Sequence, residues 1–347
     1  MEILGTRLKL KVVLLMVWLG IVVVLSLLTY HGVRVTPQWP GMIKQFHIRT
    51  NSTTTVATDD IEIAPTRFVY LTQTESCIPT YLKSPKVIGD SEACQCDIII
   101  LSFKKECNDT STSFPHVQYI FNSGKSTTWT VGRNLLYQAA KERKEKYMYY
   151  IFMDDDLQLI MADKKNTQNP WRMYEESLKT FQLAVVTLLI TYEQRGFSRK
   201  TFPERLNCEL TGYIQVYDMD AIFNAFHYQA IDYILPYTTS FDSVGWWHSQ
   251  VYLMIKCNIL FNDEVVIDPR IKVINSRHRD YPRKEFFDDV NQIVTDIRSE
   301  TPEKYRKSVE PILQQWLANF HAKKLLGRQT CKRDLFVHPY RPYENLA

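Results

Sequence analysis

Short apolar runs and apolar residues at helical spacing alternate along residues 66–300, and this alternation predicts the elements. Continuous apolar runs are typical of strands buried in a parallel sheet, whereas apolar residues three and four positions apart are typical of helices. The strands are predicted at 67–71, 97–102, 117–121, 147–153, 183–190 and 211–216, and the helices at 131–140, 171–181, 219–226, 241–257 and 303–324. The pattern therefore predicts an α/β fold with a mostly parallel sheet flanked by helices.

One predicted strand–helix–strand unit ends in a run of carboxylates. Its second strand, 147–153, stops at three consecutive acids, Asp154, Asp155 and Asp156. Such a unit forms a right-handed crossover, and ligands of open parallel sheets bind beyond the carboxyl ends of the strands. We therefore expect these three acids at the ligand-binding edge of the sheet.

Two kinds of ligand site are predicted beside this crossover. Asp154 and Asp156 share one side of an extended chain, and carboxylates facing one point repel each other unless a cation such as Mg²⁺ or Mn²⁺ lies between them. Arg133 and Asn134 lie in the first turn of the preceding helix, where free backbone amides and the helix dipole favour anions. The alternative for the three acids is a solvated turn that binds nothing.

The segment Gly132-Arg133-Asn134, followed about twenty residues later by Asp154-Asp155-Asp156, resembles the composite motif of glycosyltransferases with the GT-A fold. The resemblance implies a GT-A-like, Rossmann-type fold and a nucleotide-sugar donor, with a UDP-sugar favoured. It also implies that Asp154 and Asp156 of the DxD motif hold Mn²⁺ or Mg²⁺, that Asp154 and Asp155 contact the nucleotide, and that Arg133 and Asn134 position the donor.

Several GT-A families supply a late histidine to the metal, and the resemblance makes His278 the candidate for that ligand. The arginines around His278 could neutralise a leaving diphosphate, and the alternative is a basic surface loop. A further pair of acids, Asp218 and Asp220, could form a second DxD motif, but Asp218 is expected instead to cap the helix predicted at 219–226.

A third cluster, Asp242 with Trp246 and Trp247, fits an acceptor site. Aromatic faces pack on sugar rings, and a carboxylate can take a proton from an acceptor hydroxyl. Inverting GT-A enzymes carry their base near this point of the chain, so the resemblance makes Asp242 the candidate base, although the Glu-Asp pair frequent in the family is absent. The alternative is that Asp242 caps a helix and that both tryptophans belong to the core.

The amino-terminal residues predict a membrane anchor. Residues 12–29 are apolar and uncharged, follow a basic segment, and are long enough to span a thin bilayer. We predict a cytoplasmic tail at 1–11, the anchor at 12–29, a stem at 30–65, a catalytic domain at 66–300 and a carboxyl-terminal helix and tail at 301–347. A cleaved signal peptide is the alternative to the anchor.

The rest of the composition fits a lumenal chain. Asn51 and Asn108 begin glycosylation sequons, and the seven cysteines predict disulfides with one cysteine left over. A net charge of +4 over 347 residues does not indicate nucleic-acid binding.

The sequence thus predicts a single-pass type II protein of the Golgi membrane that transfers a hexose or hexosamine to a glycan, glycoprotein or glycolipid acceptor. The competing hypothesis is a lumenal carbohydrate-binding module without turnover, which would keep Trp246 and Trp247.

Overall fold

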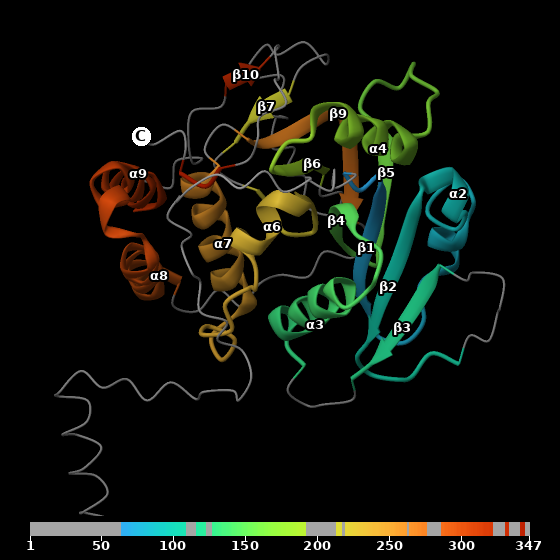
Figure 1. Cartoon of the computed structure of the whole chain (residues 1–347), viewed down its shortest axis with the longest axis horizontal. Helices are drawn as coiled ribbons and strands as arrows, with labels where there is room; N and C mark the ends of the chain where they lie inside the picture. Colours follow the sequence, from blue (N-terminus) through green and yellow to red (C-terminus); the bar gives the residue numbers. More distant parts are fainter. Residues whose placement is uncertain are drawn as a thin grey trace, which may run out of the picture. The chain divides into compact units, whose positions relative to one another are not determined.

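Helices cover both faces of one ten-stranded mixed sheet in the computed structural model of this chain (Figure 1). The structure describes residues 64–108, 116–122, 127–191, 213–216, 219–261, 264–275, 286–321, 330–332 and 341–343, and the described residues belong to one unit, Glu62–Ala347. The predicted tail, anchor and stem and Asn51 lie outside these residues. No helix of the described part is long and apolar enough to cross a membrane.

Most of the predicted strands and helices are confirmed. The strands are β1 (Arg67–Thr74), β2 (Cys96–Ser102), β3 (Val117–Phe121), β4 (Tyr147–Asp154), β5 (Leu157–Met161), β6 (Val185–Thr191), β7 (Tyr213–Gln215), β8 (Phe223–His227), β9 (Val265–Asn275) and β10 (Thr330–Lys332). The helices are η1 (Thr80–Lys83), α2 (Ser91–Cys94), α3 (Trp129–Lys141), α4 (Pro170–Phe181), α6 (Tyr228–Ile234), α7 (Trp246–Leu260), α8 (Phe286–Glu300) and α9 (Glu303–His321).

The sheet is mixed rather than mostly parallel, which corrects the prediction. Its order is β10-β7-β9-β6-β8-β4-β1-β2-β3, with β5 paired to β9. Strands β4, β1, β2 and β3 are parallel neighbours, but β8 runs antiparallel between β4 and β6. The prediction of a helix at 219–226 was wrong, because residues 223–227 form the strand β8. This strand is buried on both faces, so it lacks the alternation of apolar and solvent-facing polar residues by which a strand is recognised.

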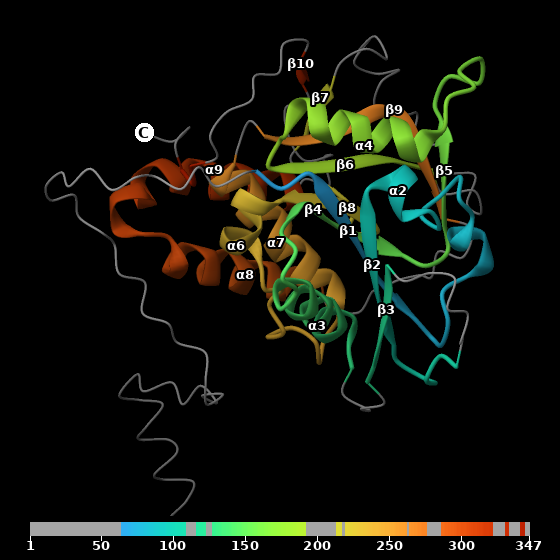
Figure 2. The ribbon, with the colours of Figure 1, turned by 45° about the vertical axis from the view of Figure 1, so that its right-hand side comes forward.

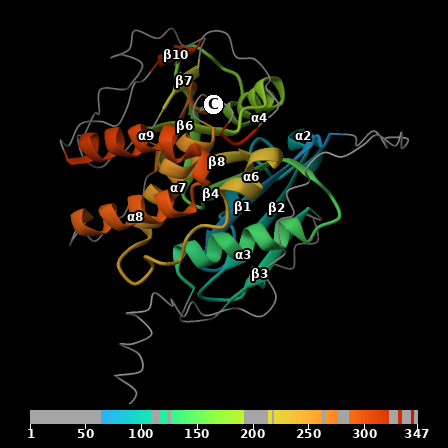
Figure 3. The same cartoon turned by 60° about the vertical axis from the view of Figure 1, so that its left-hand side comes forward.

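Strand residues alternate between two apolar cores, one on each face of the sheet. Val69 and Leu71 of β1 face the core formed with α3, α6, α7, α8 and α9, whereas Phe68 and Tyr70 face the core formed with α2 and α4. Figures 2 and 3 show α4 on one side of the sheet, and α8 and α9 side by side next to α7. The helix α3 joins β3 to β4 across β1 and β2, which lie between them in the sheet.

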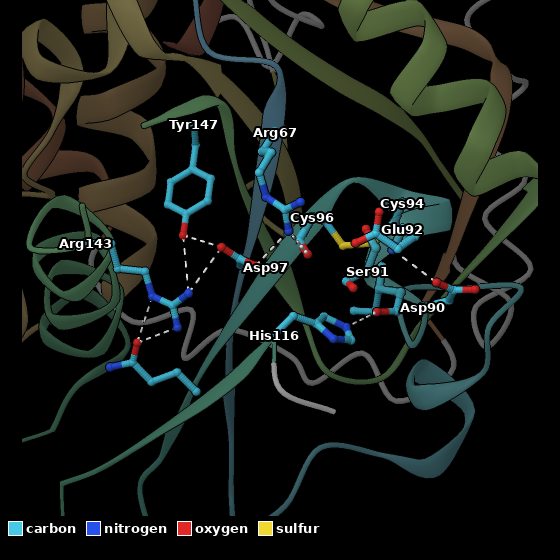
Figure 4. A network of polar contacts seen from close by, with 12 residues as sticks. Arg67, Asp90, Ser91, Glu92, Cys94, Cys96, Asp97, His116, Arg143 and Tyr147 are labelled. Atoms are coloured by element: carbon cyan, nitrogen blue, oxygen red, sulfur yellow. Dashed lines mark hydrogen bonds and ion pairs between the residues drawn. A yellow bond between two sulfur atoms is a disulfide. The ribbon is translucent and has the colours of Figure 1, made fainter. Parts of the chain in front are cut away.

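The amino ends of the four parallel strands are tied by one polar network (Figure 4). The buried Asp97 carboxylate accepts hydrogen bonds from Arg67 at 3.0 Å, from Tyr147 at 2.6 Å and from Arg143 at 3.2 Å. Arg143 also donates to Gln118 of β3 at 2.7 Å. Both carboxylate oxygens of Asp97 and both guanidinium groups make hydrogen bonds, so this network stabilises the amino ends of the strands. The acidic turn lies at the opposite, carboxyl end of β4.

Two further elements differ from the predictions. The helix expected to start at Phe241 begins at Trp246, because the chain turns at 239–245 and Gly245 takes the N-cap position. Helix α8 was not predicted; it packs with α9 through an ion pair at 2.8 Å between Arg298 and Glu310. This pair crosses the predicted boundary between residues 300 and 301, and that boundary stays a prediction.

Disulfides join Cys77 to Cys107 and Cys94 to Cys96, so the prediction that cysteines pair is confirmed for these four. Cys257 is a buried thiol in α7. Asn108 is exposed next to the first disulfide, which leaves its side chain open to solvent.

Candidate active site

The three predicted acids lie at the carboxyl end of β4, in the turn that leads to β5. Asp154 is the last residue of β4, and its backbone N–H donates to Ile222 O at 3.0 Å, which holds the strand end to the segment before β8. Asp155 and Asp156 form the turn, and β5 then pairs with β9 from Leu157 onward. The side chains of all three acids are partly exposed, so the turn opens to solvent.

Arg133 of α3 forms an ion pair with Asp154. Its Nη2 donates to Asp154 Oδ1 at 2.9 Å, and the two side chains are 2% and 31% exposed. The guanidinium also lies 4.3 Å from the centre of the Trp129 ring, a cation–π contact. Nε and Nη1 of Arg133 have no hydrogen-bond partner of normal geometry in the described part of the chain. The helix starts earlier than predicted, at Trp129, so Arg133 is its fifth residue and does not lie in its first turn. A buried cation on the side of α3, and not a free backbone amide, therefore faces the acidic turn.

Helix α3 reaches this position because Gly132 lets it approach the sheet. A Cβ at Gly132 would lie 2.0 Å from Gln73 Oε1 and 2.8 Å from Leu101 Cδ2. Gln73, near the end of β1, donates to Trp129 O at 2.9 Å and so fixes the start of the helix. In this segment, Gly132 allows α3 to pack closely on the sheet, and that packing places the Arg133 guanidinium next to Asp154.

Burial raises the pKa of Asp154 to about 7. Arg133 opposes this shift, whereas the charges of Asp156, Asp220 and Asp155 add to it. Asp220 accepts the backbone N–H of Ile222 at 3.1 Å and so brings a fourth carboxylate to the turn. Mutual repulsion of these carboxylates favours a bound cation there.

The residues of the acidic turn fit a divalent cation that shares its ligands with a substrate. Carboxylate oxygens suit Mg²⁺ and Mn²⁺, which typically take one or two carboxylates together with substrate phosphates. Within the described ranges, no three His, Cys, Asp or Glu side chains are gathered closely enough to hold a metal by themselves. His278, the predicted late ligand, lies outside these ranges.

Asn134 is engaged within the protein. Its Nδ2 donates to Tyr237 O at 2.9 Å, and its Oδ1 accepts from Tyr237 N at 2.8 Å. The Tyr237 ring packs edge-on against Trp129 and Phe152. The Asn134 amide therefore holds the backbone at Tyr237, five residues before Asp242, and both of its polar atoms are used in doing so.

Asp242 is fixed to the first turn of α3. Both Thr128 Oγ1 and Thr130 Oγ1 donate to its carboxylate, one to each oxygen. The alternative that Asp242 caps α7 is wrong, because Gly245 occupies that position. Figure 2 shows the segment before α7 beside α3, so the candidate base and the candidate donor site share one helix end.

Both candidate acceptor tryptophans are partly exposed. Trp246 stacks on Trp129 with ring centres 5.1 Å apart and an interplanar angle of 28°, and Trp247 meets His248 edge-on. One face of Trp246 is therefore covered by Trp129. Neither ring is fully buried, and Trp247 packs against the core on the α3 side of the sheet, which agrees with the alternative of a core role for that residue.

The sequence interpretation missed several residues of this region. No pattern in the sequence singles out Tyr237 or Tyr81, because only the fold brings them, together with Trp129, to the acidic turn. Trp129 had one local signal, its place between two threonines at a predicted helix start. Asp220 was noted only as a partner of Asp218, which lies outside the described residues.

The sequence matches no known family model and no curated protein. Similar folds occur among solved structures. One is residues 1–349 of TarS from S. aureus, with 9% identity and a TM-score of 0.45, covering 74% of this chain and 72% of that one. Another is GalNAc-T7 with UDP, GalNAc and Mn²⁺, with 11% identity and a TM-score of 0.42, covering 74% of this chain and 51% of that one. UDP, GalNAc and Mn²⁺ are ligands of GalNAc-T7, and this similarity does not assign them to the present chain.

Proposed function

We propose that this chain is a glycosyltransferase that transfers a hexose or hexosamine from a nucleotide sugar, with a UDP-sugar favoured, to a glycan, glycoprotein or glycolipid. The observation that carries the proposal is the ion pair between Arg133 and Asp154. It joins a buried guanidinium, which favours anions, to a turn whose carboxylates favour a cation. A metal-bound diphosphate requires both of these surroundings at one point.

The acidic turn would hold the metal and the nucleotide. Asp154 and Asp156 bind Mn²⁺ or Mg²⁺ in this proposal, with His278 as a further ligand, and Asp155 contacts the nucleotide. A divalent ion bound there would neutralise the charge that develops on the departing diphosphate. The buried positive charge of Arg133, which also lies close to the Tyr237 hydroxyl, supports a role in offsetting the charge of the donor phosphates.

The segment before α7 would serve the acceptor. Asp242 takes the proton of the attacking hydroxyl if the reaction inverts, and holds the acceptor if it retains. Each oxygen of its carboxylate accepts one threonine hydroxyl and keeps a second lone pair for an acceptor hydroxyl. Trp246 and Trp247 offer ring surface to a sugar, and Asn134 positions this segment through Tyr237.

The cellular placement is part of the same proposal. Residues 12–29 would anchor the chain in the Golgi membrane as a type II protein, with the catalytic domain in the lumen. Lumenal placement is supported by the disulfide between Cys77 and Cys107, because such bonds persist in oxidising compartments. Asn51 and Asn108 would then carry glycans.

Thermal unfolding of the full-length chain in detergent tests the proposal. We expect stabilisation by UDP only when Mn²⁺ is present, and loss of that effect in Asp154→Asn and Asp156→Asn. Lys141→Ala, on the exposed face of α3, is the control and should keep it. Release of UDP from a UDP-sugar then measures turnover. Binding of glycans without any nucleotide or metal would overturn the proposal in favour of a carbohydrate-binding module.

A further inference from the structure

Tyr81 lies against the acidic turn although it precedes that turn by more than seventy residues. Its hydroxyl contacts Asp155 O at 2.9 Å and Leu157 O at 2.6 Å. These carbonyls belong to the residues on either side of Asp156. One hydroxyl proton shared between them ties the peptide unit before Asp156 to the peptide unit that follows Leu157.

The position of Tyr81 is fixed by the segment that carries it. The segment leaves the end of β1, where Cys77 is bonded to Cys107, and continues through the buried Ile78 into η1. Leu82, the neighbour of Tyr81, is fully buried in the same apolar core as Leu157. The tyrosine is therefore held from both sides, while its ring stays 37% exposed.

A turn of consecutive aspartates needs such support. Three carboxylates follow one another in the sequence, and Asp220 lies near them through its hydrogen bond to Ile222 N, so like charges repel one another there. Asp155 and Asp156 lie between the end of β4 and the start of β5, so the direction of each carboxylate depends on the backbone conformation at 155–157. A hydroxyl that bridges Asp155 O and Leu157 O restricts that conformation.

We propose that Tyr81 is a positioning residue that fixes the conformation of the acidic turn and thereby strengthens its affinity for the metal-bound nucleotide. Tyr81 itself touches neither ligand in this proposal. The effect of Tyr81 on the conformation of the turn rests on the geometry alone. Its effect on affinity rests also on the proposed function.

Tyr81→Phe removes only the hydroxyl, and Tyr233→Phe, at an exposed tyrosine of α6, is the matched control. Hydrogen exchange of the full-length, metal-free protein should be faster in Tyr81→Phe at residues 155–161 and unchanged elsewhere. The Mn²⁺ concentration that gives half-maximal stabilisation by UDP should rise about two- to tenfold, the effect of one lost hydrogen bond. Tyr233→Phe should change neither value.

The two halves of the inference fail separately. Unchanged exchange at 155–161 would show that Tyr81 does not fix the turn, whatever the metal result. Faster exchange with an unchanged Mn²⁺ midpoint would overturn the link to affinity. A wild-type chain that shows no Mn²⁺-dependent UDP binding would overturn the proposed function and that link together, and the exchange result would still decide the role of Tyr81 in the turn.

Discussion

Arg133 and Asp154 form an ion pair at 2.9 Å that joins the second turn of α3 to the last residue of β4. The guanidinium is almost fully buried, and it stacks on Trp129, which in turn stacks on Trp246. One column of contacts thus runs from the acidic turn to the start of α7.

Loss of the buried cation should destabilise the fold. We expect Arg133→Ala to lower the free energy of unfolding by about 3 kcal/mol, because Asp154 then lacks its partner and Trp129 loses a packed neighbour. Lys141→Ala is the control on the same helix, since its pair with Asp232 is exposed on both sides and should contribute about 0.5 kcal/mol or less. Urea unfolding measures both, and equal losses would contradict the importance of the buried pair.

The two threonines that hold Asp242 should differ in their contribution. Thr128 donates to Asp242 and also accepts the Val131 N–H as the N-cap of α3. Among the described residues, the Thr130 hydroxyl contacts Asp242 and Thr128 and caps no backbone amide. We expect Thr128→Val to reduce the free energy of unfolding by about 2 kcal/mol and Thr130→Val by about 1 kcal/mol. The order of the two denaturation midpoints checks this, and the reverse order would argue against the cap.

A methyl group at Gly132 should interfere with the seat of α3 on the sheet. The new Cβ of Gly132→Ala would displace the Gln73 side chain, which would then lose its hydrogen bond to Trp129 O. We expect a loss of about 1–2 kcal/mol despite the better helix propensity of alanine. Gln73→Ala removes the closer of the two clashes and leaves the one with Leu101 Cδ2. The double variant should therefore be more stable than the sum of the single losses predicts, and a thermodynamic cycle over the four proteins measures the difference.

The acidic turn and its helix could be predicted because each is marked locally. The strand 147–153 is an apolar run that stops at Asp154, and α3 shows apolar residues at helical spacing, so both elements follow from pattern alone. That the end of this strand lies at a ligand site beside α3 followed from the rule that ligands bind at the carboxyl ends of parallel strands. The ion pair itself was not predicted, since it depends on Gly132 bringing α3 onto β1.

The remaining contacts depend on chain segments distant in sequence. Tyr81 reaches the turn through a disulfide-bonded segment, and Thr128 reaches Asp242 across 114 residues. No local pattern encodes either contact. Strand β8 was missed for another reason: burial on both faces removes the alternation by which a strand is recognised, and Asp218 nearby resembled a helix cap.

A buried carboxyl outside the candidate site should make stability depend on pH. Burial raises the pKa of Glu175 to about 8, although Arg172, the Tyr70 hydroxyl and Lys179 oppose the shift. Tyr70 donates to Glu175 Oε1 at 2.7 Å, and Arg172 lies 3.0 Å from Oε2. The folded protein therefore keeps a proton that the unfolded chain releases near the ordinary pKa of glutamate.

Since the unfolded chain binds fewer protons in this range, stability should fall as the pH rises from about 4.5 to about 8 and then level off. Glu175→Gln has no titrating group there, so its melting temperature relative to the wild type should rise over the same interval, by about 5 °C. Glu176→Gln, at the exposed neighbour in α4, is the control and should run parallel to the wild type. A difference between Glu175→Gln and the wild type that stays constant from pH 5 to pH 9 would mean that Glu175 is already ionised in the folded protein, with Arg172 outweighing the effect of burial.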